Sequence, residues 1–194
     1  MRAPRIYHFE GKGKIVLFLR NPKDIAVSFY SHLKNAKTFK NQQTWDEFFH
    51  CYVKGEIICG SIFEYLRTWE QALKDVADDK MNLKVEVFYY EEFMQNPRDN
   101  LARLNKYLGF NRDDEYLERV LKETTLGALK HYYNSCAKEM NHALTIDEKG
   151  NSIIFRKGEV GDWKNYFTVA QSELVDKLLG ESLKHGLIKI KCEL

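Results

Sequence analysis

The most constraining feature of the sequence is a short apolar run that leads directly into a proline-started helix. The run Lys14–Leu19 is rich in apolar and β-branched residues, which is typical of a strand buried on both faces in a parallel sheet. It ends at Arg20, and Pro22 suits the first turn of a helix because its missing N–H group costs nothing there. Apolar positions from Ile25 to Leu33 then follow helical spacing. The pattern predicts a strand, a tight turn and a helix.

Local signals predict the remaining elements. Thr44 and Ser61 each precede a glutamate by three residues, the spacing of a capping box, so we expect helices to follow at 45–53 and 62–74. A second strand is expected at 83–89, where apolar and polar residues alternate. Further helices are expected from Pro97 to a left-handed cap at Gly109, at 113–123, and from a cap at Thr168 to near Gly186. Strands separated by helices indicate an α/β fold with a parallel sheet flanked by helices, although only two strands are clear.

Composition limits the functional classes. The 194 residues, 44% of them apolar, predict one domain over 1–194, and 30 basic against 28 acidic residues argue against a coat for nucleic acid or anionic membrane. No apolar run is long enough to span a bilayer, and no signal-like segment precedes Lys14, so a soluble cytoplasmic protein is expected. The histidines show no metal-ligand spacing, which predicts no metal site. Reduced thiols are expected because the cysteines form no CxxC pair, at Cys51, Cys59, Cys136 and Cys192.

A first candidate site lies where the predicted strand meets the helix. A ligand of an α/β sheet binds beyond the carboxyl ends of the strands, where a helix N-terminus favours an anion. Arg20 adds a guanidinium that can grip a phosphate, and the Ser28 hydroxyl lies about one helical turn past the start. The alternative interpretation is a simple helix start in which Arg20 pairs with Asp24.

A second candidate site lies in the segment 155–164, FRKGEVGDWK. Its glycines let backbone N–H groups approach an oxyanion closely, and Arg156 with Lys157 can neutralise the charge. Phe155 and Trp163 could pack against a flat base. An exposed basic turn anchored by a buried tryptophan is the alternative. The segment belongs to a stretch, 131–160, in which periodicity fades, and we interpret that stretch as a long functional loop.

These motifs resemble those of the cytosolic sulfotransferases, which move a sulfuryl group from 3′-phosphoadenosine 5′-phosphosulfate to a hydroxyl or amine. The segment 20–30, RNPKDIAVSFY, resembles the 3′-phosphate motif of that family, and 156–164 resembles its late phosphate-binding signature. Thr44-Trp-Asp, Gly55-Glu and Tyr90-Glu-Glu resemble shorter elements between them. The resemblance runs from about Lys14 to the C-terminus.

The resemblance implies a sulfotransferase fold of the P-loop nucleotide-hydrolase type and assigns roles to individual residues. It implies a 3′-phosphate site made by Arg20, Ser28, Arg156, Lys157 and Gly158, and contacts to adenosine from Tyr90 and Thr124. Leu126 stands where the family often has a base-packing aromatic, and Ile154 also departs from its pattern. Homodimerisation is implied by a motif that matches at Lys164, Thr168, Val169 and Glu173, although Thr168 also has the interpretation of a plain helix cap.

Two parts of the family pattern find no match. The first strand, phosphosulfate-binding loop and helix have no counterpart, and residues 1–13 are interpreted as an irregular N-terminal remnant of a truncated member. His8 is the one weak candidate for the catalytic base. The expectation is a sulfotransferase-family protein with weak or no turnover on a small hydroxyl or amine acceptor; the alternative is a non-catalytic module that binds nucleotide or dimerises. An acceptor wall would include His32, Phe39, Phe49 and Tyr52.

Overall fold

The fold alternates strands and helices along the chain. The computed structural model describes residues 13–38, 42–140, 145–149 and 152–191, and the side chains of 136–140 are left out of the description. The elements in chain order are β1 (Lys14–Leu19), α1 (Pro22–Asn35), α2 (Trp45–Lys54), α3 (Ile62–Ala77), β2 (Lys84–Tyr89), α4 (Tyr90–Gln95), α5 (Pro97–Leu108), α6 (Asp114–Glu123), α7 (Leu126–Met140), the 3₁₀ helix η2 (Asp162–Asn165) and α8 (Val169–Ser182).

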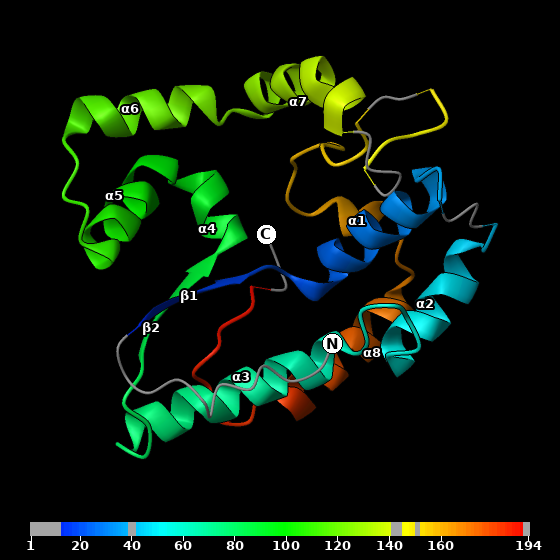
Figure 1. Cartoon of the computed structure of the whole chain (residues 1–194). Helices are drawn as coiled ribbons and strands as arrows, with labels where there is room; N and C mark the ends of the chain where they lie inside the picture. The colour runs from blue at the N-terminus through cyan, green and yellow to red at the C-terminus, as the bar shows by residue number, and fades with distance from the viewer. Residues whose placement is uncertain (1–12, 39–41, 141–144, 150–151, 192–194) are drawn as a thin grey trace.

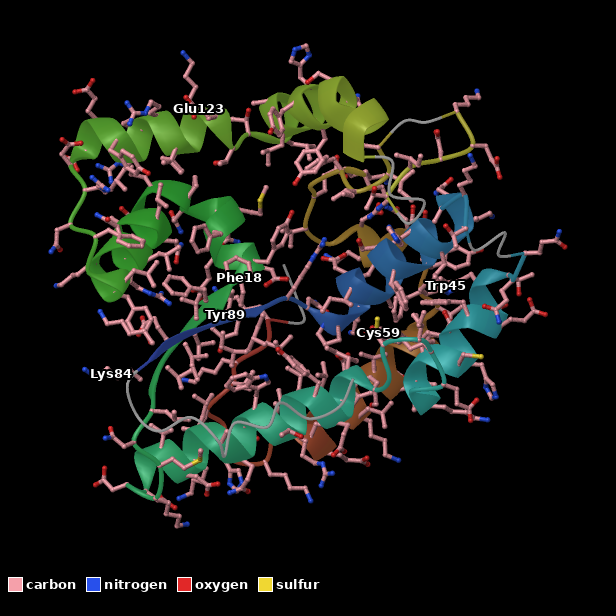
Figure 2. The ribbon with its side chains drawn as sticks, viewed as in Figure 1. Phe18, Trp45, Cys59, Lys84, Tyr89 and Glu123 are labelled. Atoms are coloured by element: carbon pink, nitrogen blue, oxygen red, sulfur yellow. The ribbon has the colours of Figure 1, made fainter. Side chains whose placement is uncertain are left out.

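The two strands form a parallel pair with helices on either side. Leu17 lies opposite Val87 and Phe18 opposite Phe88, the register of a parallel ladder. In Figure 1 the pair lies between α3 with α8 on one side and α4 to α6 on the other. Leu17 and Leu19 are buried in the core with residues of α3 and α8, whereas Phe18 faces α4 and is 49% exposed (Figure 2). The predicted α/β arrangement is confirmed, with two strands in the described ranges. The expectation that the first strand is buried on both faces is wrong, because Val16 and Phe18 on one face are exposed.

A cluster of aromatic rings joins α1 to α2. Phe48 is completely buried, and its ring centroid lies 5.3 Å from that of Tyr30 and 5.8 Å from that of Trp45. The Tyr52 hydroxyl donates a 2.7 Å hydrogen bond to the carbonyl of Pro22, at the first turn of α1. Burial raises the pKa of Tyr52, so the phenol stays protonated and keeps this bond. The Tyr52 hydroxyl therefore joins α2 to the start of α1, where the first candidate site lies.

The helix ends follow the sequence signals closely. Thr44 and Thr168 both form complete capping boxes, and Ser61 accepts a hydrogen bond from the backbone N–H of Glu64. Pro22 occupies the first turn of α1, and Asn21 caps it by accepting from the backbone N–H of Lys23. These predictions of helix starts are confirmed.

Two expectations about the elements need correction, and one helix was not expected. The stretch 131–160 is not a continuous loop, because α7 extends through residue 140. The last helix ends at Ser182, before the expected stop near Gly186. The short helix α4 begins directly at the end of β2 and was not expected.

No helix among the described residues is long and apolar enough to cross a bilayer.

The C-terminal segment is tied to α3 by one buried carboxylate. Glu70 is 1% exposed and accepts hydrogen bonds from three backbone N–H groups, those of His185 (3.0 Å), Leu187 (3.1 Å) and Ile188 (3.4 Å). Farther along, the carbonyl of Lys191 accepts from the side-chain amide of Asn21 at 3.0 Å. The chain after α8 thus returns to the residue that begins α1.

Candidate functional site

The two motifs singled out in the sequence line one cavity. A cavity of about 210 Å³ lies at the carboxyl end of β1, between the start of α1 and the segment 154–158. Its lining contains six of the predicted site residues together with three apolar neighbours: Arg20, Ser28, Tyr90, Arg156, Lys157 and Gly158, with Leu126, Ile154 and Phe155. The structure therefore brings together side chains that are far apart in the sequence.

Arg20 contributes a guanidinium that is only partly satisfied. Its Nη2 donates to the backbone carbonyl of Glu159 at 3.2 Å, and its Cζ lies 4.3 Å from the ring centroid of Tyr90. Its Nε is buried and has no hydrogen-bond partner among the described residues. Buried donors are nearly always paired in native proteins, so this N–H group is an unused donor on a residue that lines the cavity.

Gly158 lines the cavity with backbone atoms in a left-handed conformation. Its φ of +69° lies in the left-handed region, and a Cβ at this position would stand 3.1 Å from Leu126 Cδ2. A side chain there would meet backbone strain, and Leu126 would have to move by a few tenths of an ångström to make room for it. The left-handed conformation therefore favours glycine at the position where the turn lines the cavity.

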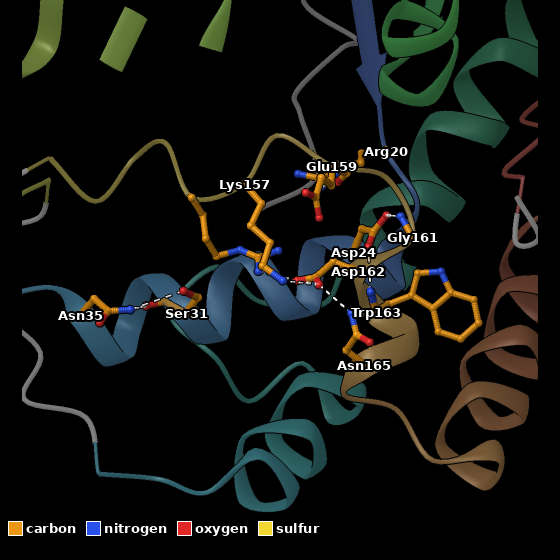
Figure 3. Close-up of polar contacts among 11 residues, drawn as sticks. Arg20, Asp24, Ser31, Asn35, Lys157, Glu159, Gly161, Asp162, Trp163 and Asn165 are labelled. Carbon is orange, nitrogen blue, oxygen red and sulfur yellow. Dashed lines mark hydrogen bonds and ion pairs between the residues drawn. The ribbon is translucent and has the colours of Figure 1, made fainter. Parts of the chain in front are cut away.

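Asp162 holds the two cations of the turn. Its side chain is 1% exposed and forms an ion pair with Arg156, a 2.6 Å bond to Lys157 Nζ and a 2.9 Å bond from the Asn165 amide (Figure 3). Burial raises the pKa of the Asp162 carboxyl, but the bonds from Lys157, Asn165 and Arg156 outweigh burial and bring its pKa to about 2. The carboxylate is ionised at neutral pH and keeps both cations in place.

Asp24 joins the first motif to the second. Its Oδ2 accepts from the backbone N–H of Gly161 at 2.8 Å and its Oδ1 from that of Trp163 at 3.0 Å (Figure 3). Asp24 is 1% exposed and lies in the first turn of α1. The alternative interpretation, in which Asp24 pairs with Arg20, is therefore wrong.

Lys23 and Trp163 form a contact outside the cavity. Lys23 is buried; its Nζ bonds to Ser172 Oγ at 2.7 Å, pairs with Asp176 and lies 4.4 Å from the ring centroid of Trp163. The Trp163 ring also packs edge-on against Phe167. Trp163 does not line the cavity, so the expectation that it packs on a base needs correction. Phe155, its proposed companion, does line the cavity.

A larger apolar groove adjoins the cavity. It has a volume of about 890 Å³ and shares Tyr90, Leu126, Phe155 and Gly158 with the smaller cavity. Thr124, predicted to contact adenosine, lines this groove. A small cationic cavity that opens into an apolar groove has the layout that a nucleotide phosphate and its base require.

The remaining predicted residues lie elsewhere. Phe49 and Tyr52 are 6% and 1% exposed in the core, so they form no acceptor wall. His8 and Phe39 lie outside the described residues. The expected dimer motif runs from η2 into α8, away from both cavities. Within the described ranges no cluster of three metal-ligating side chains occurs.

Comparison with known proteins identifies the family. The family model described as sulfotransferase domain matches residues 2–186. The chain belongs to the sulfotransferase domain family. Sulfotransferase 6B1 of Danio rerio is 32% identical over 175 residues, covering 90% of this chain and 53% of that protein. Human sulfotransferase 2A1 is 31% identical, with 90% and 58% covered.

Solved structures of sulfotransferases share the fold. The crystal structure of mouse sulfotransferase SULT7A1 complexed with PAP matches with a TM-score of 0.72 and 31% identity, covering 89% of this chain and 58% of that one. Retinol dehydratase matches with the same TM-score of 0.72 at 22% identity, which shows the fold alone. This sulfotransferase domain spans between half and three fifths of the length of these curated relatives.

Two acidic residues that shape the site were not assigned such roles from the sequence. Glu91 is 2% exposed and accepts from the backbone N–H of Asn21 at 2.8 Å, which joins the end of β2 to the start of α1. Asp162 was seen only as part of a signature. For Glu91, the signal in the sequence is its place just past the end of a parallel strand, where a carboxylate can meet the free N–H groups of a neighbouring helix start.

Proposed function

We propose that the cavity binds the 3′-phosphate of 3′-phosphoadenosine 5′-phosphosulfate, the donor in sulfuryl transfer to a hydroxyl or amine of a small molecule. The observation that carries the proposal is the buried, unpartnered Nε of Arg20 in a cavity shared with the cationic turn 156–158. The PAP complex of mouse SULT7A1, which shares the fold at 31% identity, supports it.

The small cavity binds the phosphate of the donor, and the groove binds its adenosine. Arg20, Arg156 and Lys157 neutralise the phosphate, while the Ser28 hydroxyl and the backbone at Gly158 donate hydrogen bonds. In the groove, Tyr90 and Thr124 contact the adenosine, and the apolar faces of Leu126 and Phe155 take the base. Holding the donor at this end fixes where its sulfuryl group lies, and positioning is a large part of catalysis for transfers of this type.

Turnover also requires a base that reaches the acceptor hydroxyl or amine. In the described ranges no histidine lines either cavity. We therefore propose that this chain by itself binds the donor and transfers sulfuryl weakly or not at all. A non-catalytic nucleotide-binding module is the second candidate function, and the same cavity supports it.

The experiment is isothermal titration of the full chain with adenosine 3′,5′-bisphosphate. We expect micromolar binding, weakened about 10- to 100-fold by Arg156→Ala, because a charge-assisted hydrogen bond to phosphate contributes about 1.5–3 kcal/mol. Arg67→Ala is the matched control, since Arg67 pairs with Glu64 and neither residue lines either cavity. Absence of binding by the unaltered chain would contradict the proposal. Incubation with radiolabelled donor and a panel of phenols and amines then separates the two candidate functions.

We also propose that the chain is a cytoplasmic homodimer that pairs through Lys164, Thr168, Val169 and Glu173. Val169 supports this because its side chain is 76% exposed at the start of α8, beside a capping box that fixes the local backbone. Cys51 forms no disulfide in the part of the chain that the structure describes, which suits a reducing compartment. Sedimentation velocity tests the dimer: we expect Val169→Glu to shift the chain toward monomer, and identical sedimentation of both proteins would contradict it.

A further inference from the structure

The Asp162 carboxylate is saturated by the side chains of its own turn. Both oxygens are used, Oδ2 by Arg156 Nη1 and Oδ1 by Lys157 Nζ and Asn165 Nδ2. The carboxylate is 1% exposed, whereas the Arg156 and Lys157 side chains are 21% and 44% exposed. A buried anion therefore anchors two cations whose outer parts reach the cavity surface.

The anchoring leaves donors for a ligand. A guanidinium carries five N–H donors in a planar fork and an ammonium carries three, so one bond from each to Asp162 leaves most of them available. The shared carboxylate also holds two like charges side by side, an arrangement that their mutual repulsion opposes. The hydrogen bond to Asp162 raises the pKa of Lys157, which keeps its ammonium charged.

We propose that Asp162 is a positioning residue that aligns Arg156 and Lys157 for the 3′-phosphate; this rests on the proposed function. The opposite role is that Asp162 competes with the ligand for the two cations. The two roles predict opposite signs. If Asp162 competes, removing its charge strengthens binding of an anion. If it positions the cations, removing its charge weakens binding, because the side chains lose their fixed geometry and must be ordered when the ligand binds.

The test compares two nucleotides that differ only in the 3′-phosphate, adenosine 3′,5′-bisphosphate and adenosine 5′-phosphate. We expect Asp162→Asn to weaken binding of the bisphosphate about tenfold and to leave binding of the 5′-phosphate unchanged. Asp114→Asn is the matched control: it makes the same change in net charge at the exposed ion pair with Arg98, outside both cavities. We expect it to alter neither affinity.

A second variant covers the case in which Asp162→Asn does not fold. Asn165→Ala removes the neutral partner of Asp162 at an exposed position, and we expect about threefold weaker binding of the bisphosphate alone. NMR titration of the Lys157 ammonium gives a readout independent of nucleotide: its pKa should fall when Asp162 is replaced.

The outcomes separate this inference from the proposed function. If the unaltered chain binds no bisphosphate, the proposed function fails and the role of Asp162 fails with it. If the unaltered chain binds but Asp162→Asn, or Asn165→Ala where the first variant is unfolded, binds equally well or more tightly, only the positioning role is overturned. Equal weakening for both nucleotides also overturns it, because a general loss of structure would have that effect.

Discussion

Asp24→Ala is expected to lower the free energy of unfolding by about 2–4 kcal/mol and to abolish measurable binding of adenosine 3′,5′-bisphosphate. The substitution leaves two partly buried N–H groups, at Gly161 and Trp163, without their acceptor. The turn that carries Arg156 and Lys157 then loses its attachment to α1. Thermal unfolding measures the first effect, as a decrease of roughly 5–15 °C in Tm for a chain of this size, and calorimetry measures the second.

Asp24→Asn is the matched variant for this prediction. An amide keeps one acceptor but turns the other arm into a donor that faces an N–H group, so we expect most of the stability loss to remain. Ser31→Ala, farther along α1 and outside the cavity lining, should leave bisphosphate binding unchanged. Unchanged melting and unchanged affinity for Asp24→Ala would show that the two backbone bonds do not hold the turn in solution.

Phe48→Ala is expected to lower the free energy of unfolding by about 3–5 kcal/mol, because it removes a fully buried ring from the α1–α2 cluster and leaves a cavity. Phe48 contacts the rings of Phe29, Tyr30, Trp45 and Tyr52. It lines neither cavity, so nucleotide affinity well below the midpoint of unfolding should be retained. Denaturant unfolding followed by circular dichroism measures the loss.

Phe110→Ala is the control for Phe48→Ala. Phe110 is 64% exposed, so the same truncation should change stability by no more than about 0.5 kcal/mol. Equal losses for the two variants would contradict the assignment of Phe48 to the core. Loss of nucleotide binding by folded Phe48→Ala would instead show that the cluster acts directly on the start of α1.

The parts of the fold that follow local rules were predicted from the sequence. The strand at 14–19 and the helix after Pro22 were found because burial and capping leave signals within a few neighbouring residues. Helix α7 was not predicted from the sequence, because most of its described side chains are exposed. A helix that buries so little apolar surface has little periodicity for a sequence to show.

Several residues that line the cavity were predicted from the sequence, whereas the bonds that hold the site together were not. Arg20 lies where a strand ends and a helix begins, a position that favours anions, and the turn 156–158 contains two cations and a glycine. The partners of Asp24 lie 137 and 139 residues away in the chain, and no local pattern specifies such a pairing. Glu70 did leave a signal, because it falls on the apolar stripe of α3 beside Leu66 and Trp69. A lone carboxylate on such a stripe requires a partner.

The hydrogen bonds between Glu70 and the chain after α8 have a consequence for sequence variation. In the described contacts the carboxylate accepts from main-chain N–H groups. The side chains at 185 and 187 can therefore be substituted without loss of these hydrogen bonds. Proline is the exception at 185, 187 and 188, because it would delete a donor outright. Related domains that retain this tie should therefore vary widely at 185 and 187 while excluding proline at 185, 187 and 188, and the carboxylate on α3 must be kept.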